Sequence, residues 1–176
     1  MKKVFALFLA VCIVLSIPLH VSAVDSVTAY VMPQNLPQQY VSTNFSVSAS
    51  GTAVPVYNVG QNVWNANVAY CAFEFTGTVT LSVTTDFNFS TARVLPRSAG
   101  VSCTKSGNTV TFTLDSPQNV TILFDENFQG KAIHIFAQEP ETDTPDLSDE
   151  NVIYFGPGYY DYSSSAPLIL TSGQTL

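Results

Sequence analysis

Apolar and small polar residues alternate at every second position over much of the chain. Because successive side chains of a β-strand point to opposite faces, this alternation predicts strands with one buried face and one face in water. No long stretch repeats its apolar residues at the helical period, so helices should be scarce. The clearest alternating runs are Val41–Val47, Val79–Val83, Val110–Leu114 and Val120–Phe124.

Turn-forming residues separate these runs at strand-length spacing. Phe75-Thr76-Gly77-Thr78 and Lys105-Ser106-Gly107-Asn108 are typical of hairpin turns, in which glycine supplies a positive φ without strain. Residues 129–131 mark a further turn. Roughly eight to ten short strands at this spacing predict an all-β fold, an antiparallel Ig-like β-sandwich rather than a βαβ fold.

The N-terminus has the pattern of a secretory signal. Lys2 and Lys3 precede an uncharged run, Val4–Leu19, which is followed by the small residues Val21-Ser22-Ala23. The uncharged run is shorter than the roughly 20 residues that a membrane-spanning helix needs. We therefore predict a cleaved signal peptide over residues 1–23, a secreted or extracytoplasmic location, and a bacterial source from the Met-Lys-Lys start.

The composition supports one packed domain of acidic character. The 176 residues are 46% hydrophobic and 12% aromatic, enough to fill a core, and we place the β-sandwich domain at residues 24–150. The formal net charge is −7, and signal cleavage removes two lysines. Because neutralising phosphates needs a basic surface, nucleic acid is excluded as a partner, and no membrane association is expected after cleavage.

Two cysteines, Cys71 and Cys103, remain after signal cleavage, in the strand-like segments Val68–Phe75 and Gly100–Thr104. In an exported protein they could form a disulfide across a sheet or between two sheets. The alternative is two separate thiols that act as small hydrophobic side chains. The sequence leaves both alternatives open.

Catalytic chemistry has little support in the sequence. The one histidine that remains, His134, lies between two isoleucines, so on a strand it should point away from them and into solvent. No nucleophile motif accompanies it. Glycoside hydrolysis needs two carboxylates across a cleft, whereas the adjacent pairs Asp125-Glu126 and Asp149-Glu150 lie in loop-like sequence. We predict no catalytic residues and no cofactor.

An acidic segment, Gln138–Asn151, follows the last β-like run. Its clustered carboxylates and prolines are typical of a solvated loop. Calcium binding is the alternative, but the spacing lacks the residue order of a calcium-binding loop. We therefore predict no metal site in this segment.

Aromatic residues in two polar segments are candidates for stacking on sugar rings. Trp64 lies in the Asn-rich segment Asn58–Asn67, and a second group follows the acidic segment and consists of Tyr159, Tyr160 and Tyr162. The alternative is that these side chains cover the edge of the sandwich core, with the rings buried and their polar atoms in water.

The C-terminal third also carries an ordered series of motifs that resembles a known class of enzymes. The series consists of Val110–Leu114, Ser116–Val120, Ile133–Ala137, Pro140, Asn151–Gly158 and Leu170–Leu176. It resembles the N-terminal β-sandwich region of secreted glycoside hydrolases with a parallel β-helix catalytic domain, as in dextranase-like (family 49) and polygalacturonase-like (family 28) enzymes. The resemblance covers residues 68–176.

The resemblance implies a role for the whole chain. In these enzymes a motif like Phe155–Gly158, followed by one like Gly173–Leu176, leads into the first coil of a right-handed parallel β-helix. Residues 151–176 are then the linker and start of a β-helix, cut short here. Catalytic carboxylates of the family lie in the β-helix coils, so none is carried over.

We therefore expect a fragment: the non-catalytic N-terminal β-sandwich domain of an exported polysaccharide-degrading glycoside hydrolase. Its expected partners are a polysaccharide or the missing β-helix domain. Two alternatives come from other functional classes. One is a free-standing carbohydrate-binding or surface-adhesion module that uses Trp64 and the tyrosines, and the other is an independent enzyme.

Overall fold

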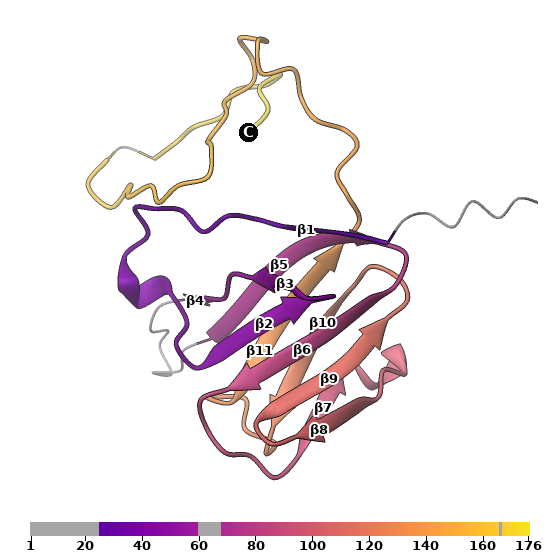
Figure 1. Cartoon of the computed structure of the whole chain (residues 1–176). Coiled ribbons are helices and arrows are strands. Elements are labelled where there is room, and N and C mark those ends of the chain that lie inside the picture. The colour runs from indigo at the N-terminus through magenta and orange to yellow at the C-terminus, as the bar shows by residue number, and fades with distance from the viewer. Residues whose placement is uncertain (1–24, 60–67, 166) are drawn as a thin grey trace, which may run out of the picture.

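The computed structural model describes residues 25–59, 68–165 and 167–176. In these parts the chain forms eleven strands in two sheets that lie face to face, a β-sandwich (Figure 1). The helical content of the described residues is two short 3₁₀ turns, η1 (Gln38–Tyr40) and η2 (Arg97–Ala99). The all-β prediction is confirmed, while the expected signal peptide, residues 1–23, lies outside the described residues.

The six-stranded sheet has the order β1-β5-β11-β10-β7, and β4 pairs with β5 beyond the end of β1. Its strands are β1 (Ser26–Ala29), β4 (Tyr57–Val59), β5 (Val68–Thr76), β7 (Ala92–Leu95), β10 (Gln118–Phe124) and β11 (Ala132–Gln138). The five-stranded sheet has the order β3-β2-β6-β9-β8. Its strands are β2 (Phe45–Ala49), β3 (Thr52–Val54), β6 (Val79–Thr85), β8 (Cys103–Ser106) and β9 (Thr109–Leu114).

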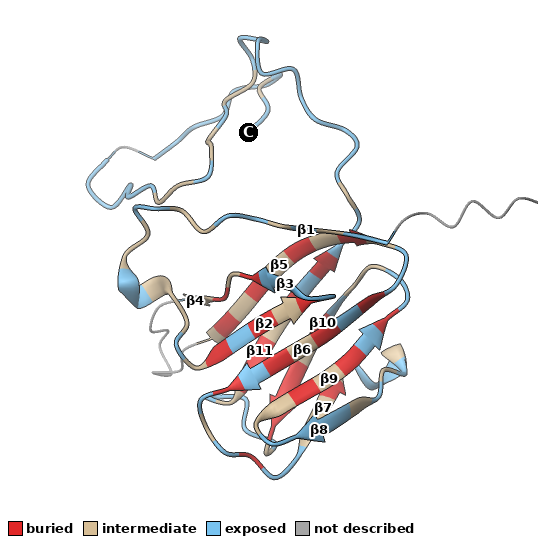
Figure 2. Ribbon diagram, viewed as in Figure 1, coloured by how far each residue is buried: buried red, intermediate tan, exposed pale blue. Residues whose placement is uncertain are grey.

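The predicted alternation decides which side chains enter the core. Three of the four alternating runs lie within β6, β9 and β10, and their alternate apolar side chains are buried between the sheets (Figure 2). The fourth run is shorter than expected, because β2 begins at Phe45 and Val41 forms only an isolated pairing with Tyr57.

Aromatic contacts near one end of β10 join the two sheets. Phe124 is fully buried, and its ring lies 4.7 Å from that of Phe89, 5.7 Å from that of Phe87 and 5.9 Å from that of Phe45. Phe45 belongs to the opposite sheet. Rings at these separations add a specific contribution to the free energy gained by burying their area.

One predicted hairpin is confirmed and another is wrong. β8 and β9 pair across Gly107-Asn108 as a two-residue hairpin. The segment at Gly77 instead carries the chain from β5 in one sheet to β6 in the other. Gly77 has a φ of +72°, and a Cβ atom there would clash with Oδ1 of Asp25. The sequence marked the turn correctly, but not the change of sheet.

The sandwich is not wholly antiparallel, which corrects the expected architecture. β11 pairs in parallel with β5, for example Ile135 beside Cys71, while the other strand pairs of the described residues are antiparallel. Parallel neighbours need a long crossover, and here the chain passes through the second sheet before it returns. Local alternation cannot reveal the direction of a strand's neighbour.

The disulfide alternative is also wrong, since both cysteines are free thiols. Cys71 lies on β5, and Cys103 lies on β8 next to β7, where its Sγ donates to the carbonyl of Ala92 at 3.6 Å. β11 and β10 separate β5 from β7, a distance of roughly 14 Å at ordinary strand spacing. A disulfide needs Cα atoms within about 7 Å. Burial raises the pKa of the Cys71 thiol to about 12.

The sandwich strands end at Gln138, and the rest of the chain extends away from them (Figure 1). This C-terminal segment, residues 139–176, folds back on itself. Val152 and Thr175 form a parallel bridge: the N–H of Ile153 donates to the carbonyl of Thr175 at 2.8 Å, and the N–H of Thr175 donates to that of Asn151 at 2.9 Å.

Replacing Phe124 by Ala should destabilise the sandwich by about 3–5 kcal/mol, because the change removes a fully buried ring and leaves a cavity between the sheets. Urea unfolding followed by circular dichroism measures the loss. Phe128→Ala is the matched control, since Phe128 is 60% exposed and its removal should change stability by less than about 0.5 kcal/mol. Equal losses in the two variants would contradict this account of the core.

Acid should weaken the connection between β10 and β11. The backbone N–H of Thr91, the Lys131 ammonium and the backbone N–H of Ser90 all donate to the Asp125 carboxylate and lower its pKa to about 2. A pKa lower in the folded than in the unfolded state stabilises the fold above about pH 4, and this contribution disappears as the pH falls towards 2.

Asp125→Asn should therefore lower Tm by a few degrees at neutral pH and flatten the acid dependence of Tm. Thermal melts from pH 7 to pH 2 measure both effects. The control is Asp143→Asn, because the Asp143 carboxylate is exposed and makes no hydrogen bond to the described residues. Parallel Tm profiles for wild type and Asp125→Asn would show that the prediction is wrong.

Candidate functional site

The candidate site lies on the outer face of the six-stranded sheet, the face turned away from the five-stranded sheet. On β5, Cys71 and Phe73 are buried in the core, so the residues between and beyond them point outward. The register brings outward side chains of β5, β11 and β10 side by side in rows. One row is Tyr57, Tyr70, His134, Thr121 and Leu95, and the next is Ala72, Phe136 and Asn119.

Aromatic rings form one part of this face. Tyr57 and Tyr70 stack on one another with centroids 5.4 Å apart, and the ring of Phe136 meets Tyr70 edge-on at 6.4 Å. Phe136 is 38% exposed, which is high for a phenylalanine on a sheet. Burial raises the pKa of the Tyr57 hydroxyl, as expected for a ring packed against its neighbour.

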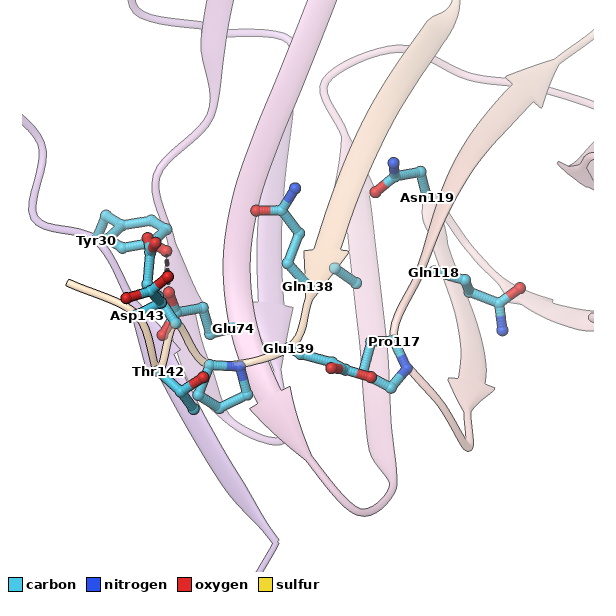
Figure 3. Close-up of a pocket in the computed structure, with 12 residues that line it drawn as sticks. Tyr30, Glu74, Pro117, Gln118, Asn119, Gln138, Glu139, Thr142 and Asp143 are labelled. Atoms are coloured by element: carbon cyan, nitrogen blue, oxygen red, sulfur yellow. Dashed lines mark hydrogen bonds between the residues drawn. The ribbon is translucent and has the colours of Figure 1, made fainter. Parts of the chain in front are cut away.

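A polar hollow of about 570 Å³ adjoins the rings at the end of β11. Figure 3 shows Gln138 and Asn119 projecting from neighbouring strands into this region, with Tyr30 and Glu74 at its other side. The acidic residues Glu139, Glu141 and Asp143 complete its rim. The hollow is therefore lined by hydrogen-bonding groups and carries negative charge.

An apolar hollow of about 410 Å³ lies on the other side of Asn119. Leu95, Pro96, His134 and Phe136 line it. Asn119 lines both hollows, so the two lie side by side on β10 and β11, and together they are called the depression below.

Two hydrogen bonds hold polar side chains around the hollows in place. The Tyr30 hydroxyl donates to Oε1 of Glu74 at 2.5 Å. This bond, followed by burial and the charge of Glu74, raises the pKa of Tyr30 to about 12, so the hydroxyl keeps its proton at neutral pH. Nδ1 of His134 lies 2.8 Å from Oγ1 of Thr121, and burial lowers the pKa of the imidazole.

The tyrosines expected to bind sugars belong to the C-terminal segment instead of the sheet, and none of them lines either hollow. Tyr159 is held by Asn35 through two hydrogen bonds of 3.4 Å and packs on Tyr40 with ring centroids 5.5 Å apart. Tyr160 and Tyr162 both meet the ring of Phe155 edge-on, at 5.1 and 6.1 Å. These two remain about half exposed, while Trp64 lies outside the described residues.

The sequence did contain a signal for the outer face. Alternation placed Glu74 and His134 opposite their apolar neighbours, and the structure confirms both orientations. Applied to Tyr70 and Phe136, the same rule would have put two aromatic rings on the water-facing side. Their meeting across β5 and β11 was not predictable, because it depends on the parallel pairing of those strands.

Both adjacent carboxylate pairs, Asp125-Glu126 and Asp149-Glu150, contain side chains that form contacts within the fold. Asp125 accepts the hydrogen bonds described above, and Glu126 forms an ion pair with Arg93. Asp149 accepts hydrogen bonds from the backbone and side chain of Asn151 at 2.9 and 3.0 Å. Within the described ranges, no group of three or more His, Cys, Asp or Glu side chains is placed to hold a metal ion.

No helix among residues 25–59, 68–165 and 167–176 combines the length and the apolar character that crossing a bilayer requires.

Comparison with known proteins shows a likeness of fold. No protein-family model matches the sequence, and no curated protein matches it. A solved structure, Dex49A from Penicillium minioluteum, matches with a TM-score of 0.51 and 14% sequence identity. The match covers 73% of this chain and 35% of that chain, so this chain spans about a third of the length of the structure it resembles. The likeness shows that the two-sheet fold resembles part of that structure.

Proposed function

We propose that this chain is the non-catalytic N-terminal β-sandwich region of an exported polysaccharide-degrading glycoside hydrolase. In this proposal the catalytic part is a right-handed parallel β-helix that begins within residues 151–176. The sandwich then covers the first coil of the β-helix, because a solenoid needs a cap over its exposed end.

The fold likeness supports the family assignment. Dex49A is a dextranase of glycoside hydrolase family 49, one of the two families that the motif series resembles. Motif order and fold are separate lines of support, since the motifs come from the sequence and the likeness comes from the arrangement of strands. The coverage of 35% of Dex49A fits a chain that corresponds to one region of a larger enzyme.

The parallel bridge between Val152 and Thr175 is the observation that carries the proposal. In a parallel β-helix each coil brings the chain back beside its own starting strand, in the same direction. The chain leaves Val152 and later returns beside it, so that Thr175 pairs with Val152 in parallel. A first coil of a β-helix has this connectivity.

Exposed apolar side chains on the C-terminal segment give further support. Leu147, Tyr154, Ile169 and Leu176 are between 59% and 76% exposed. Leu147, Tyr154 and Leu176 also line a hollow of about 860 Å³ with Val152 and Phe155. Apolar surface gathered in this way is expected where another part of a protein packs. A following β-helix coil would cover it.

A free-standing carbohydrate-binding module is the second candidate. The observation that favours it is the outer sheet face, where aromatic rings and free amides line one depression. The two candidates are compatible, because a sandwich that caps a hydrolase can also hold its substrate. Export under the N-terminal signal fits both, since polysaccharides lie outside the cell.

Sequencing the gene beyond codon 176 tests the leading proposal. We expect the reading frame to continue into a repetitive sequence of short strands with paired carboxylates, as a β-helix hydrolase requires. A stop codon at that point, with no β-helix frame downstream, would falsify the proposal.

The parallel bridge itself can be tested in the protein. Thr175→Pro removes the N–H that donates to Asn151, so the amide of Ile153 should lose its protection in hydrogen exchange, while the Tm of the sandwich stays unchanged. Ser172→Pro is the control. Ser172 is the second residue of a turn closed by the Gln174 N–H and the Thr171 carbonyl, with Gly173 at a φ of +91°, a turn type that favours proline there. Rapid exchange at Ile153 in the wild-type protein would contradict the pairing.

A further inference from the structure

The depression on the outer sheet face presents three kinds of groups that recognise sugars. Phe136 offers an exposed ring, and the amides of Asn119 and Gln138 are exposed and have no hydrogen-bond partner among the described residues. The Glu74 carboxylate lies beyond them, oriented by Tyr30. A hexose has an apolar face of C–H groups that packs on a ring, and hydroxyls that both donate and accept.

The shape of the face fits a polymer better than a single sugar. The row from Tyr57 to Leu95 crosses five neighbouring strands, a span of roughly 19 Å at ordinary strand spacing. The two hollows join at Asn119 and are open to solvent along this surface. A chain of several sugar units can lie along such a depression without entering a closed pocket.

The charge of the face selects among polysaccharides. Glu74, Glu139, Glu141 and Asp143 line the polar hollow. These carboxylates accept hydrogen bonds from the hydroxyls of a neutral glycan, whereas they repel the carboxylates of a uronic acid polymer at close range. The ligand that fits is therefore uncharged.

The same charge disfavours a protein partner on this face. Burying carboxylates against another protein surface costs free energy unless each one finds a cationic partner, and protein interfaces are depleted of Asp and Glu for this reason. A glycan leaves most of the rim in contact with water and supplies a hydroxyl donor wherever a carboxylate is covered. The outer face thus suits a sugar chain better than a neighbouring domain.

We propose that the outer face of the six-stranded sheet binds a neutral polysaccharide, with Phe136 as the stacking ring and Asn119, Gln138 and Glu74 as hydrogen-bonding groups. This inference rests on the proposed function for its class of ligand, and it places the binding residues on the sheet rather than on Tyr160 and Tyr162. The sandwich would then hold the polymer that the hydrolase cuts.

Affinity gel electrophoresis of the purified exported chain tests the proposal. Native gels contain dextran, xylan or pectin, and mobility is compared with that in a gel without polysaccharide. We expect dextran or xylan to retard the wild-type chain and pectin, which is anionic, to leave it unretarded. Phe136→Ala should weaken binding roughly tenfold, the equivalent of about 1.4 kcal/mol. Asn119→Ala and Gln138→Ala should each weaken it several-fold.

Tyr160→Ala is the matched control, because it removes an exposed aromatic ring from the C-terminal segment and leaves the sheet untouched. It should bind like the wild type. Thermal melts check that each variant is folded. If Phe136→Ala is unfolded, the binding of Asn119→Ala and Gln138→Ala decides the outcome. The proposal is overturned if folded wild-type chain is unretarded by both neutral polymers, if pectin retards it more strongly, or if the loss follows Tyr160 instead of the sheet residues.

Failure of this inference and failure of the proposed function give different results. If the gene continues into a β-helix frame but the chain binds no neutral polysaccharide, only the inference about the binding face is refuted. A chain that binds dextran through Phe136 but has a true stop at codon 176 removes the hydrolase proposal and leaves a free-standing binding module.

Discussion

The contact between Phe124 and Phe45 joins the two sheets near one end of the sandwich, and other features of the molecule depend on it. The centroids of the two rings are 5.9 Å apart, and Phe87 and Phe89 pack around Phe124 from the connection between β6 and β7. Because alternate side chains of each strand are buried in this core, the side chains between them point to the outer face. The positions of Tyr70 and Phe136 on the outer face follow from the burial of their neighbours.

The alternation of the sequence predicted β6, β9 and β10, but not how the strands of the sandwich are connected. β6, β9 and β10 lie where the apolar periodicity placed them, since burial of one face is a local property. The sheet change at Gly77 and the parallel pairing of β5 with β11 depend on contacts between distant parts of the chain. The same limit explains the cysteines. Val68–Phe75 lies within β5, whereas only Cys103 and Thr104 of the segment Gly100–Thr104 lie in a strand, and the sequence does not show that the two strands belong to different sheets.

The candidate site shows this limit most clearly. The sequence drew attention to tyrosines gathered in one segment, because residues close in sequence are easily seen together. In the structure Tyr159 packs against Asn35 and Tyr40. The rings that contact one another on the sheet are those of Tyr57, Tyr70 and Phe136, which come from three separate strands. A binding surface on a sheet is assembled across strands, so its residues are scattered in the sequence and only strand order brings them together.

The anchoring of Tyr159 by Asn35 and Tyr40 has a consequence for the order in which the protein is assembled. Asn35 and Tyr40 precede every strand of the five-stranded sheet, while Tyr159 follows the last strand of the sandwich. Since a chain emerges from the ribosome N-terminus first, both residues that hold Tyr159 have been made before Tyr159 itself. The C-terminal segment is therefore the last part to be synthesised, and contacts with residues near the beginning of the chain hold it in place.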